Sequence, residues 1–80
     1  MKIRVETDKY SFNEAFEELQ YDLPELTFKY AKILHEMQSY NCIMAWTFKD
    51  KTSIKIIPAQ YKYVGETVLK QVGYTFIFNI

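Results

Sequence analysis

The sequence predicts a single α+β domain with an antiparallel four-stranded sheet and helices packed on one face. Two observations predict this class. Several short segments alternate apolar and polar side chains, as half-buried strands do, and other segments show the apolar spacing of amphipathic helices. A length of 80 residues allows one domain, over 1–80. An apolar fraction of 49% can build a core and is not typical of a disordered chain.

The first strand and the first helix follow from residues 1–20. Residues 1–6 alternate apolar and polar side chains, which predicts a half-buried strand. Ser11 and Glu14 then form an S-x-x-E capping box, in which the hydroxyl accepts from the third amide and the carboxylate reaches back. An apolar stripe over 12–19 predicts a helix that ends near Gln20.

A second helix is predicted from Asp22 to about Tyr40. Asp22 can cap it, and Pro24 suits its first turn. Phe28 lies away from the apolar stripe of this helix, near His35. We expect Phe28 to pack on the first helix, with contact to a partner as the alternative.

Two further strands are predicted over 42–48 and 52–57, joined by a turn at 49–51. A loop of two or four residues would place Trp46 opposite Lys55. A loop with an odd number of residues would reverse the faces of one strand.

The segment 58–72 fits a helical stripe, with Pro58 near its start and Gly73 as its C-terminal cap. Its internal glycine lowers helix propensity, so the helix could begin only at Glu66. Residues 74–80 alternate again and predict the last strand.

The order of elements is strand, helix pair, strand, strand, helix, strand. This order resembles the ferredoxin-like βαββαβ sandwich, with its first helical region split in two. The alternative is another α+β sandwich with a three-stranded sheet and 58–72 as a loop. The resemblance concerns topology only, and this fold hosts many unrelated functions.

Catalytic chemistry has little support in the sequence. One cysteine excludes a disulfide framework, and one cysteine with one histidine excludes an ordinary zinc site. Two isolated glycines exclude a glycine-rich phosphate loop. His35 and Cys42 could form a nucleophilic pair only if the fold brings them together. We therefore predict no enzyme, no catalytic residue, no cofactor and no metal site.

Alternation assigns the side chains of each strand to one of two faces. Ile3, Val5, Ile43, Ala45, Ile54, Ile56, Phe76 and Phe78 are predicted to face the helices. The open face is predicted to carry Lys2, Arg4, Glu6, Met44, Trp46, Phe48, Ser53, Lys55, Ile57, Thr75, Ile77 and Asn79. An alternative reading places Trp46 and Phe48 in the core.

Two kinds of binding suit such an open face. A cluster of Trp46, Phe48 and Met44 beside Lys55 is typical of a protein interface or a homodimer seam. Aromatic rings that stack on bases, with cations on phosphates, would bind single-stranded nucleic acid. The RNA-recognition motif has its aromatics on the first and third strands, whereas here they lie on the second, an edge strand. This difference favours a protein partner.

The first helix offers a second surface. Glu14, Glu17 and Glu18 belong to a segment with five acids and no base. Such a segment is either an ordinary solvated helix face or a contact for a basic partner. The predicted partner-binding residues are Trp46, Phe48, Lys55, Met44, Glu14, Glu17, Glu18 and Phe28.

The predicted function is a small non-enzymatic protein-interaction module, a regulator or inhibitor of a larger protein, with single-stranded nucleic-acid binding as the alternative. Its partner would be a host protein or a second copy. Residues with AT-rich codons fill 36 of 80 positions, as in many small phage and bacterial proteins. The chain shows no secretory signal and no apolar stretch of membrane-spanning length. We therefore expect a cytoplasmic protein without a membrane partner.

Overall fold

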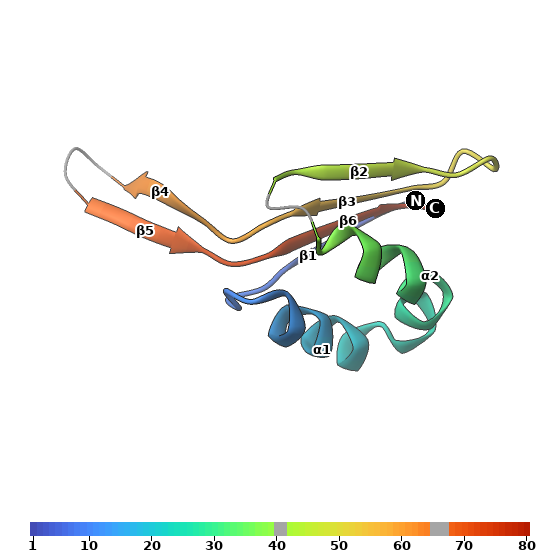
Figure 1. Ribbon diagram of the computed structural model, residues 1–80, viewed down its shortest axis with the longest axis horizontal. Coiled ribbons are helices and arrows are strands. Elements are labelled where there is room, and N and C mark those ends of the chain that lie inside the picture. The colour runs from blue at the N-terminus through green and yellow to red at the C-terminus, as the bar shows by residue number, and fades with distance from the viewer. Residues whose placement is uncertain (40–41, 65–67) are drawn as a thin grey trace.

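The protein was described from a computed structural model that covers residues 1–39, 42–64 and 68–80, with side chains placed outside 60–71. Two helices and six strands follow one another within these described residues (Figure 1). In order they are β1 (Lys2–Glu6), α1 (Phe12–Asp22), α2 (Pro24–Met37), β2 (Met44–Thr47), β3 (Ser53–Ile57), β4 (Gln60–Val64), β5 (Val68–Val72) and β6 (Thr75–Asn79).

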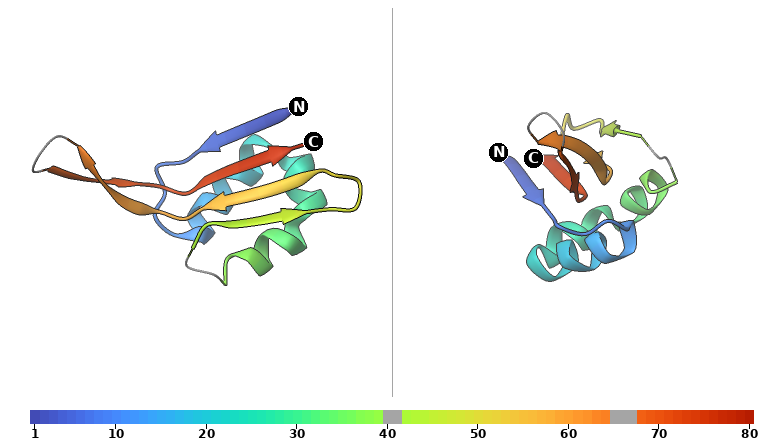
Figure 2. Two further views of the ribbon diagram at one scale, coloured as in Figure 1. Left: turned by 90° about the horizontal axis from the view of Figure 1, so that it is seen from above. Right: turned by 90° about the vertical axis from the view of Figure 1, so that its left-hand side faces the viewer.

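The main sheet has four antiparallel strands in the order β1-β6-β3-β2. Both helices lie on one of its faces, and the other face is open (Figures 1 and 2). The predicted α+β class, the four-stranded antiparallel sheet and the split first helical region are therefore confirmed. The ferredoxin-like order is not confirmed, because β4 and β5 stand where the second crossover helix was predicted.

The core lies between the helices and the covered face of the sheet. Its buried side chains come from both helices and from the two central strands, and most follow the predicted stripes. They are Phe12, Ala15, Leu19, Tyr30, Leu34, Met37, Ile54, Ile56, Phe76 and Phe78. Ile3 and Val5 of β1 pack against this cluster, as predicted.

The helix pair forms largely as the sequence predicts. The Ser11 hydroxyl caps α1 by accepting from the Glu14 amide at 3.4 Å. The prediction that Asp22 caps α2 is wrong, because Asp22 is still the last residue of α1. Leu23 is the single residue between the helices, and the buried Thr27 hydroxyl donates to its carbonyl at 2.6 Å. α2 ends at Met37, three residues before its predicted end at about Tyr40, a residue that itself lies outside the described ones.

The helix predicted over 58–72 is wrong, because this segment contributes two strands of a long hairpin. Ile57 pairs with Thr75, and three residues further Gln60 pairs with Val72, so the register continues without a shift. The hairpin β4–β5 thus prolongs β3 and β6 beyond the helices (Figure 1). Two tyrosines and three valines supply five of the fifteen residues of this segment, and their strand preference outweighs a helical spacing. The predicted start at Glu66 lies outside the described residues.

The hairpin is interrupted at Pro58 and Tyr74, where its two halves meet. Proline has no N–H to donate to a strand ladder. The backbone of Tyr74 instead bonds the segment after β1, because its N–H donates to Lys9 O and its C=O accepts from Thr7 N, each at 2.9 Å. The chain crosses so closely here that a Cβ on Gly73 would lie 2.3 Å from Thr7 O. Gly73 is therefore required by this crossing and is not the predicted helix cap.

The turn between β2 and β3 has an odd number of residues, which reverses the predicted faces of β2. Phe48 N–H donates to Thr52 O at 2.9 Å across a three-residue loop, and Lys51 takes a left-handed backbone with φ of 69°. Trp46 consequently pairs with Ile54, and Ala45 pairs with Lys55. Paired residues share a face, so the predicted open-face position of Trp46 is wrong.

The same reversal applies to the other residues of this segment. Met44 pairs with the buried Ile56, and both Met44 and Phe48 pack against the core, so their predicted open-face positions are also wrong. Ala45 was predicted to face the helices and lies on the open face instead. Ile43 was predicted, like Ala45, to face the helices, but its side chain is exposed.

The Asp50 carboxylate organises this turn. It accepts from the Thr52 hydroxyl at 2.6 Å and from the Thr52 amide at 3.1 Å. These hydrogen bonds lower the pKa of Asp50 below its ordinary value. Because the folded-state pKa is depressed, the stabilisation is present above the unfolded pKa of about 3.9 and is lost as pH falls through the folded value.

Asp50→Asn should therefore change how stability depends on pH. Asparagine keeps an acceptor oxygen but does not titrate. The deficit in the variant's free energy of unfolding, relative to wild type, should therefore be largest near neutral pH. The deficit should shrink as pH falls below about 4. Urea unfolding of both proteins between pH 2 and 7 measures this. A deficit that stays constant over that range would show that the charge of Asp50 does not act in the turn.

Candidate binding surfaces

The open face of the main sheet holds nine of the residues predicted for it. They are Lys2, Arg4, Glu6, Ser53, Lys55, Ile57, Thr75, Ile77 and Asn79. Ile77 is buried although no helix covers this face, since its paired neighbours are Arg4 on one side and Lys55 on the other. Long cationic side chains can cover apolar surface with their aliphatic stems. The open face is thus polar and cationic, and Lys55 is separated from Trp46 by the sheet.

Trp46 lies at the β2 edge of the sheet, on the side of the helices, and 42% of its surface is exposed. It borders a hollow of about 300 Å³ that Met44 and the C-terminal end of α2 complete. The α2 side of the hollow comes from Glu36, Met37 and Ser39.

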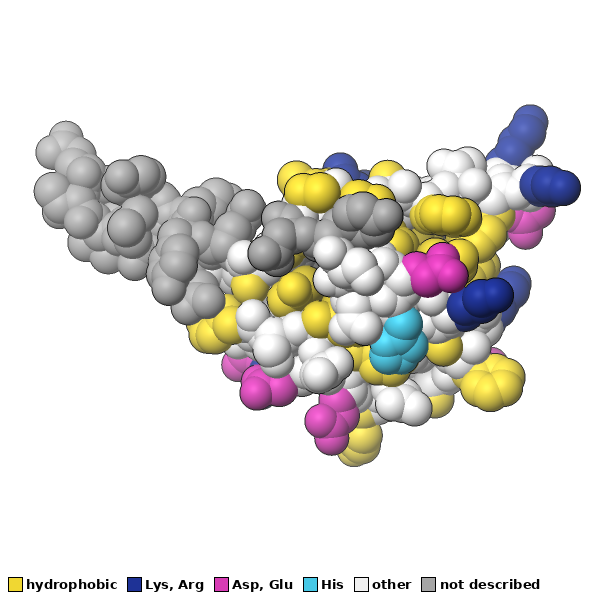
Figure 3. All heavy atoms as spheres, viewed as in Figure 1, with side chains coloured by type: hydrophobic (Ala, Val, Ile, Leu, Met, Phe, Trp, Pro, Cys, Tyr) yellow, Lys and Arg dark blue, Asp and Glu magenta, His cyan; other side chains and the backbone are white. Residues whose placement is uncertain are grey.

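Ile43 precedes this strand and is exposed as well. In the view of Figure 3, hydrophobic side chains reach the surface over β2. We call the set Trp46, Met44, Ile43, Met37, Glu36 and Ser39 the β2 surface.

Sequence reasoning found Trp46 and Met44 but missed the α2 part of the β2 surface. The alternative of an odd loop already indicated it. An odd loop turns Trp46 toward the helices, so the C-terminal end of α2 becomes its neighbour at this edge of the sheet.

Phe48 is not part of the β2 surface. Its ring lies 5.2 Å from the ring of Tyr30, and it is half-buried against the core. Its packing makes Phe48 a core residue at the edge of the sheet, as the alternative reading proposed.

The three predicted acidic residues come together on α1. Glu14, Glu17 and Glu18 surround a shallow hollow of about 420 Å³ with Lys9 and Tyr21. Glu14 and Glu17 are exposed, and Glu18 is half-buried. One carboxylate oxygen of Glu18 is buried and has no hydrogen-bond partner among the described residues. Lys9 brings a positive charge that the sequence pattern did not include.

Phe28 is exposed over 87% of its surface. The prediction that it packs on α1 is therefore wrong. Its exposure leaves partner contact as the alternative that the sequence offered.

His35 and Cys42 have different neighbours. The His35 ring lies 4.6 Å from Phe16 and 5.9 Å from Phe12, whereas the Cys42 thiol lies 3.9 Å from the Met44 sulfur. Both residues are exposed. Within the described residues, no group of three or more histidine, cysteine or acidic side chains converges as metal ligands would.

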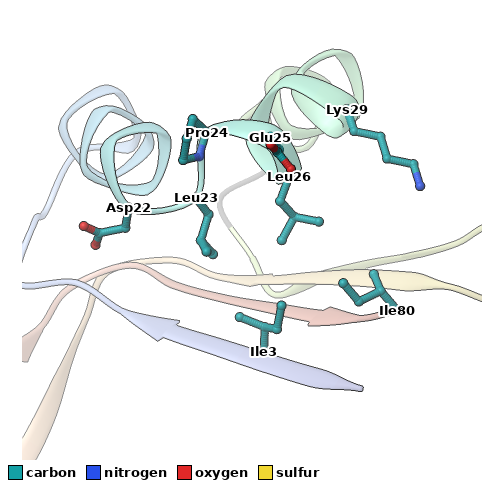
Figure 4. Close-up of a pocket in the computed structure, with 8 residues that line it drawn as sticks. All are labelled: Ile3, Asp22, Leu23, Pro24, Glu25, Leu26, Lys29 and Ile80. Atoms are coloured by element: carbon teal, nitrogen blue, oxygen red, sulfur yellow. The ribbon is translucent and has the colours of Figure 1, made fainter.

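A further hollow of about 430 Å³, which the sequence did not indicate, lies between β1 and the helix pair (Figure 4). Ile3, Leu23, Leu26 and Ile80 make its walls apolar. Asp22, Pro24, Glu25 and Lys29 complete its lining. This hollow lies next to β1, which is an edge strand of the main sheet.

Comparison with known proteins finds no match: no family model fits the chain, and no curated protein or solved structure is significantly similar to it. In the described part of the chain, neither helix has the length and apolar character needed to cross a membrane.

Proposed function

We propose that this chain is a non-enzymatic protein-interaction module, a small regulator or inhibitor that binds a larger protein through its β2 surface. The observation that supports this most is the exposure of Trp46 on an edge strand, beside a hollow. Tryptophan is enriched among the residues that dominate binding energy at protein interfaces, where it usually fills or borders a pocket.

The composition of the β2 surface supports a protein partner. Met44, Ile43 and Trp46 supply apolar area, and methionine adapts to partners of irregular shape. Glu36 and Ser39 add polar groups at the rim, as in protein interfaces with an apolar centre and a polar border. The outer edge of β2, which pairs with no other strand among the described residues, adds backbone donors and acceptors next to these side chains.

The acidic set on α1 is a second, separate contact in this proposal. Glu14, Glu17 and Glu18 would meet a basic part of the same partner, and such charges mainly affect the association rate. Phe28 is the remaining proposed contact residue.

Single-stranded nucleic-acid binding was the alternative predicted from the sequence. That function needs aromatic rings and cations on one surface. Trp46 and Lys55 lie on opposite faces of the sheet, so the geometry does not favour this alternative.

The test is affinity capture from a host lysate, with and without nuclease, followed by titration of the purified partner. Trp46→Ala should weaken binding by about 2 kcal/mol or more, which is about thirtyfold in Kd. The substitution removes the largest exposed side chain of the β2 surface, whereas the fold should persist. Circular dichroism and a thermal transition check that the variant is folded.

Tyr10→Ala is the matched control, since it removes an aromatic ring that is at least as exposed, at 51%, but lies before α1 and in neither proposed contact. It should bind the partner about as well as wild type. A captured protein that binds Trp46→Ala and wild type equally would contradict the proposal. Recovery of nucleic acid alone, lost after nuclease, would replace it with the alternative.

A further inference from the structure

The outer edge of β1 is unpaired within the described residues and carries a regular arrangement of charge. β1 has one neighbour in the sheet, β6, and neither helix covers its other edge (Figure 2). Thr7 N–H donates to Tyr74 O, and Ile80 N–H donates to Met1 O. Because backbone groups alternate in direction, the odd residues bond β6, and the N–H and C=O groups of Lys2, Arg4 and Glu6 point outward.

We infer that β1 pairs with β1 of a second copy in an antiparallel, two-fold symmetric contact centred on Val5. The argument rests on the order of charges at the even positions. Lys2 and Arg4 are positive, and Glu6 and Asp8 are negative. Reversing the direction of such a segment places each positive side chain opposite a negative one.

Only one register satisfies both the backbone and the charges. The outward groups belong to even residues, so even residues must face even residues. Centring the pair on Arg4 or on Glu6 makes that residue face itself, and centring it on Ile3 places Lys2 opposite Arg4. Like charges directly opposite one another destabilise a strand pair.

Centring on Val5 places Arg4 opposite Glu6 twice within the strand and directs Lys2 toward Asp8, which follows β1 and contacts Lys9 Nζ at 3.6 Å in its own copy. Within each copy, Arg4 Nε already contacts Glu6 Oε1 at 2.8 Å, and both side chains remain largely exposed. The two-fold contact would join two such pairs into a network of four alternating charges. An isolated exposed ion pair contributes little, but a network contributes more.

The covered side of β1 also suits an added strand. Ile3 and Val5 are only half-buried, although they belong to the core side of the sheet. The apolar hollow walled by Ile3, Leu23, Leu26 and Ile80 opens beside this edge (Figure 4). A second β1 would bring Val5 opposite Val5 and continue the apolar layer past the edge. This contact is independent of the β2 surface, which lies at the other edge of the sheet.

Sedimentation equilibrium at several protein concentrations tests the contact with charge variants. Wild type should form dimers as concentration rises. Arg4→Glu places like charges opposite one another at two symmetric positions, and Glu6→Arg does the same. Each should raise the dimer dissociation constant by about tenfold or more. An equimolar mixture of the two variants should associate like wild type, because each then meets its complement, and the double variant R4E/E6R should also associate.

Lys55→Glu is the matched control, because it makes the same charge change on the same sheet face but two strands from β1. It should leave association unchanged, and so should Trp46→Ala, which tests the other edge. Monomeric wild type at every concentration would overturn the inference. So would single variants that associate as tightly as wild type, or a mixture of them that stays monomeric.

Discussion

Gly73→Ala should lower the free energy of unfolding by roughly 3 kcal/mol, the upper end of the range for overpacking. The added Cβ would lie 2.3 Å from Thr7 O, 2.7 Å from Lys9 N and 2.8 Å from Lys9 O. All three are backbone atoms, so no side chain can rotate away to relieve the contact. The segment after β1 would have to move, which would disturb its bonds to Tyr74. Urea unfolding measures the loss.

Thr7→Val provides the comparison for this junction. It keeps the side-chain volume but removes the hydroxyl that donates to Tyr74 O at 2.8 Å and accepts from Lys9 N at 3.2 Å. It should cost about 1–3 kcal/mol, because the part-buried Lys9 N–H loses its acceptor, while Tyr74 O keeps only the hydrogen bond from Thr7 N–H. Wild-type stability in Gly73→Ala would mean that the chain does not cross as closely at this point as the structure shows.

Phe78→Ala should lower the free energy of unfolding by about 3–5 kcal/mol. Phe78 has no exposed surface and belongs to β6, which pairs with both β1 and β3. Its ring lies 6.2 Å from that of Tyr30 on α2, so it joins the centre of the sheet to the helix layer. Removing the ring leaves a cavity that the surrounding strands cannot readily close.

Phe28→Ala is the matched control for this loss, because it removes the same atoms from a position that is 87% exposed. Its effect on stability should stay within about 0.5 kcal/mol. Equal losses from both substitutions, measured by urea unfolding, would contradict the core described here.

Local signals predicted the helix pair and the first and last strands of the chain, β1 and β6, well. The Ser11 cap and the apolar stripes concern residues three or four positions apart, so one sequence contains all the information that they need. The segment 58–72 was mispredicted because Tyr61, Val64, Val68 and Val72 satisfy a helical spacing and also favour strands. Only pairing with the rest of the chain decides between helix and strand. Here the register that continues from Ile57 to Gln60 decides for strands.

The candidate site was predictable in its residue types but not in its geometry. Trp46 was singled out from the sequence, but the face that it occupies depends on whether the 49–51 loop is odd or even. Lys51 takes the left-handed conformation that usually favours glycine or asparagine, so its residue type gave no warning. The sequence did contain one indication of a compact turn. Asp50 precedes Thr52 by two residues, and an aspartate side chain at that spacing can hydrogen-bond the backbone and close such a turn.

The pairing of β1 with β6 joins the two ends of the chain, with Met1 opposite Ile80 and Lys2 opposite Asn79. This has a consequence for the order of folding. Loop-closure entropy grows with the length of chain enclosed, and here nearly the whole chain is enclosed. The hairpin of β3, β4, β5 and β6 closes a much shorter segment, so it can form before β1 arrives. β1 should then be the last strand to join, and until it does, the edge of β6 that β1 covers is also open to other chains.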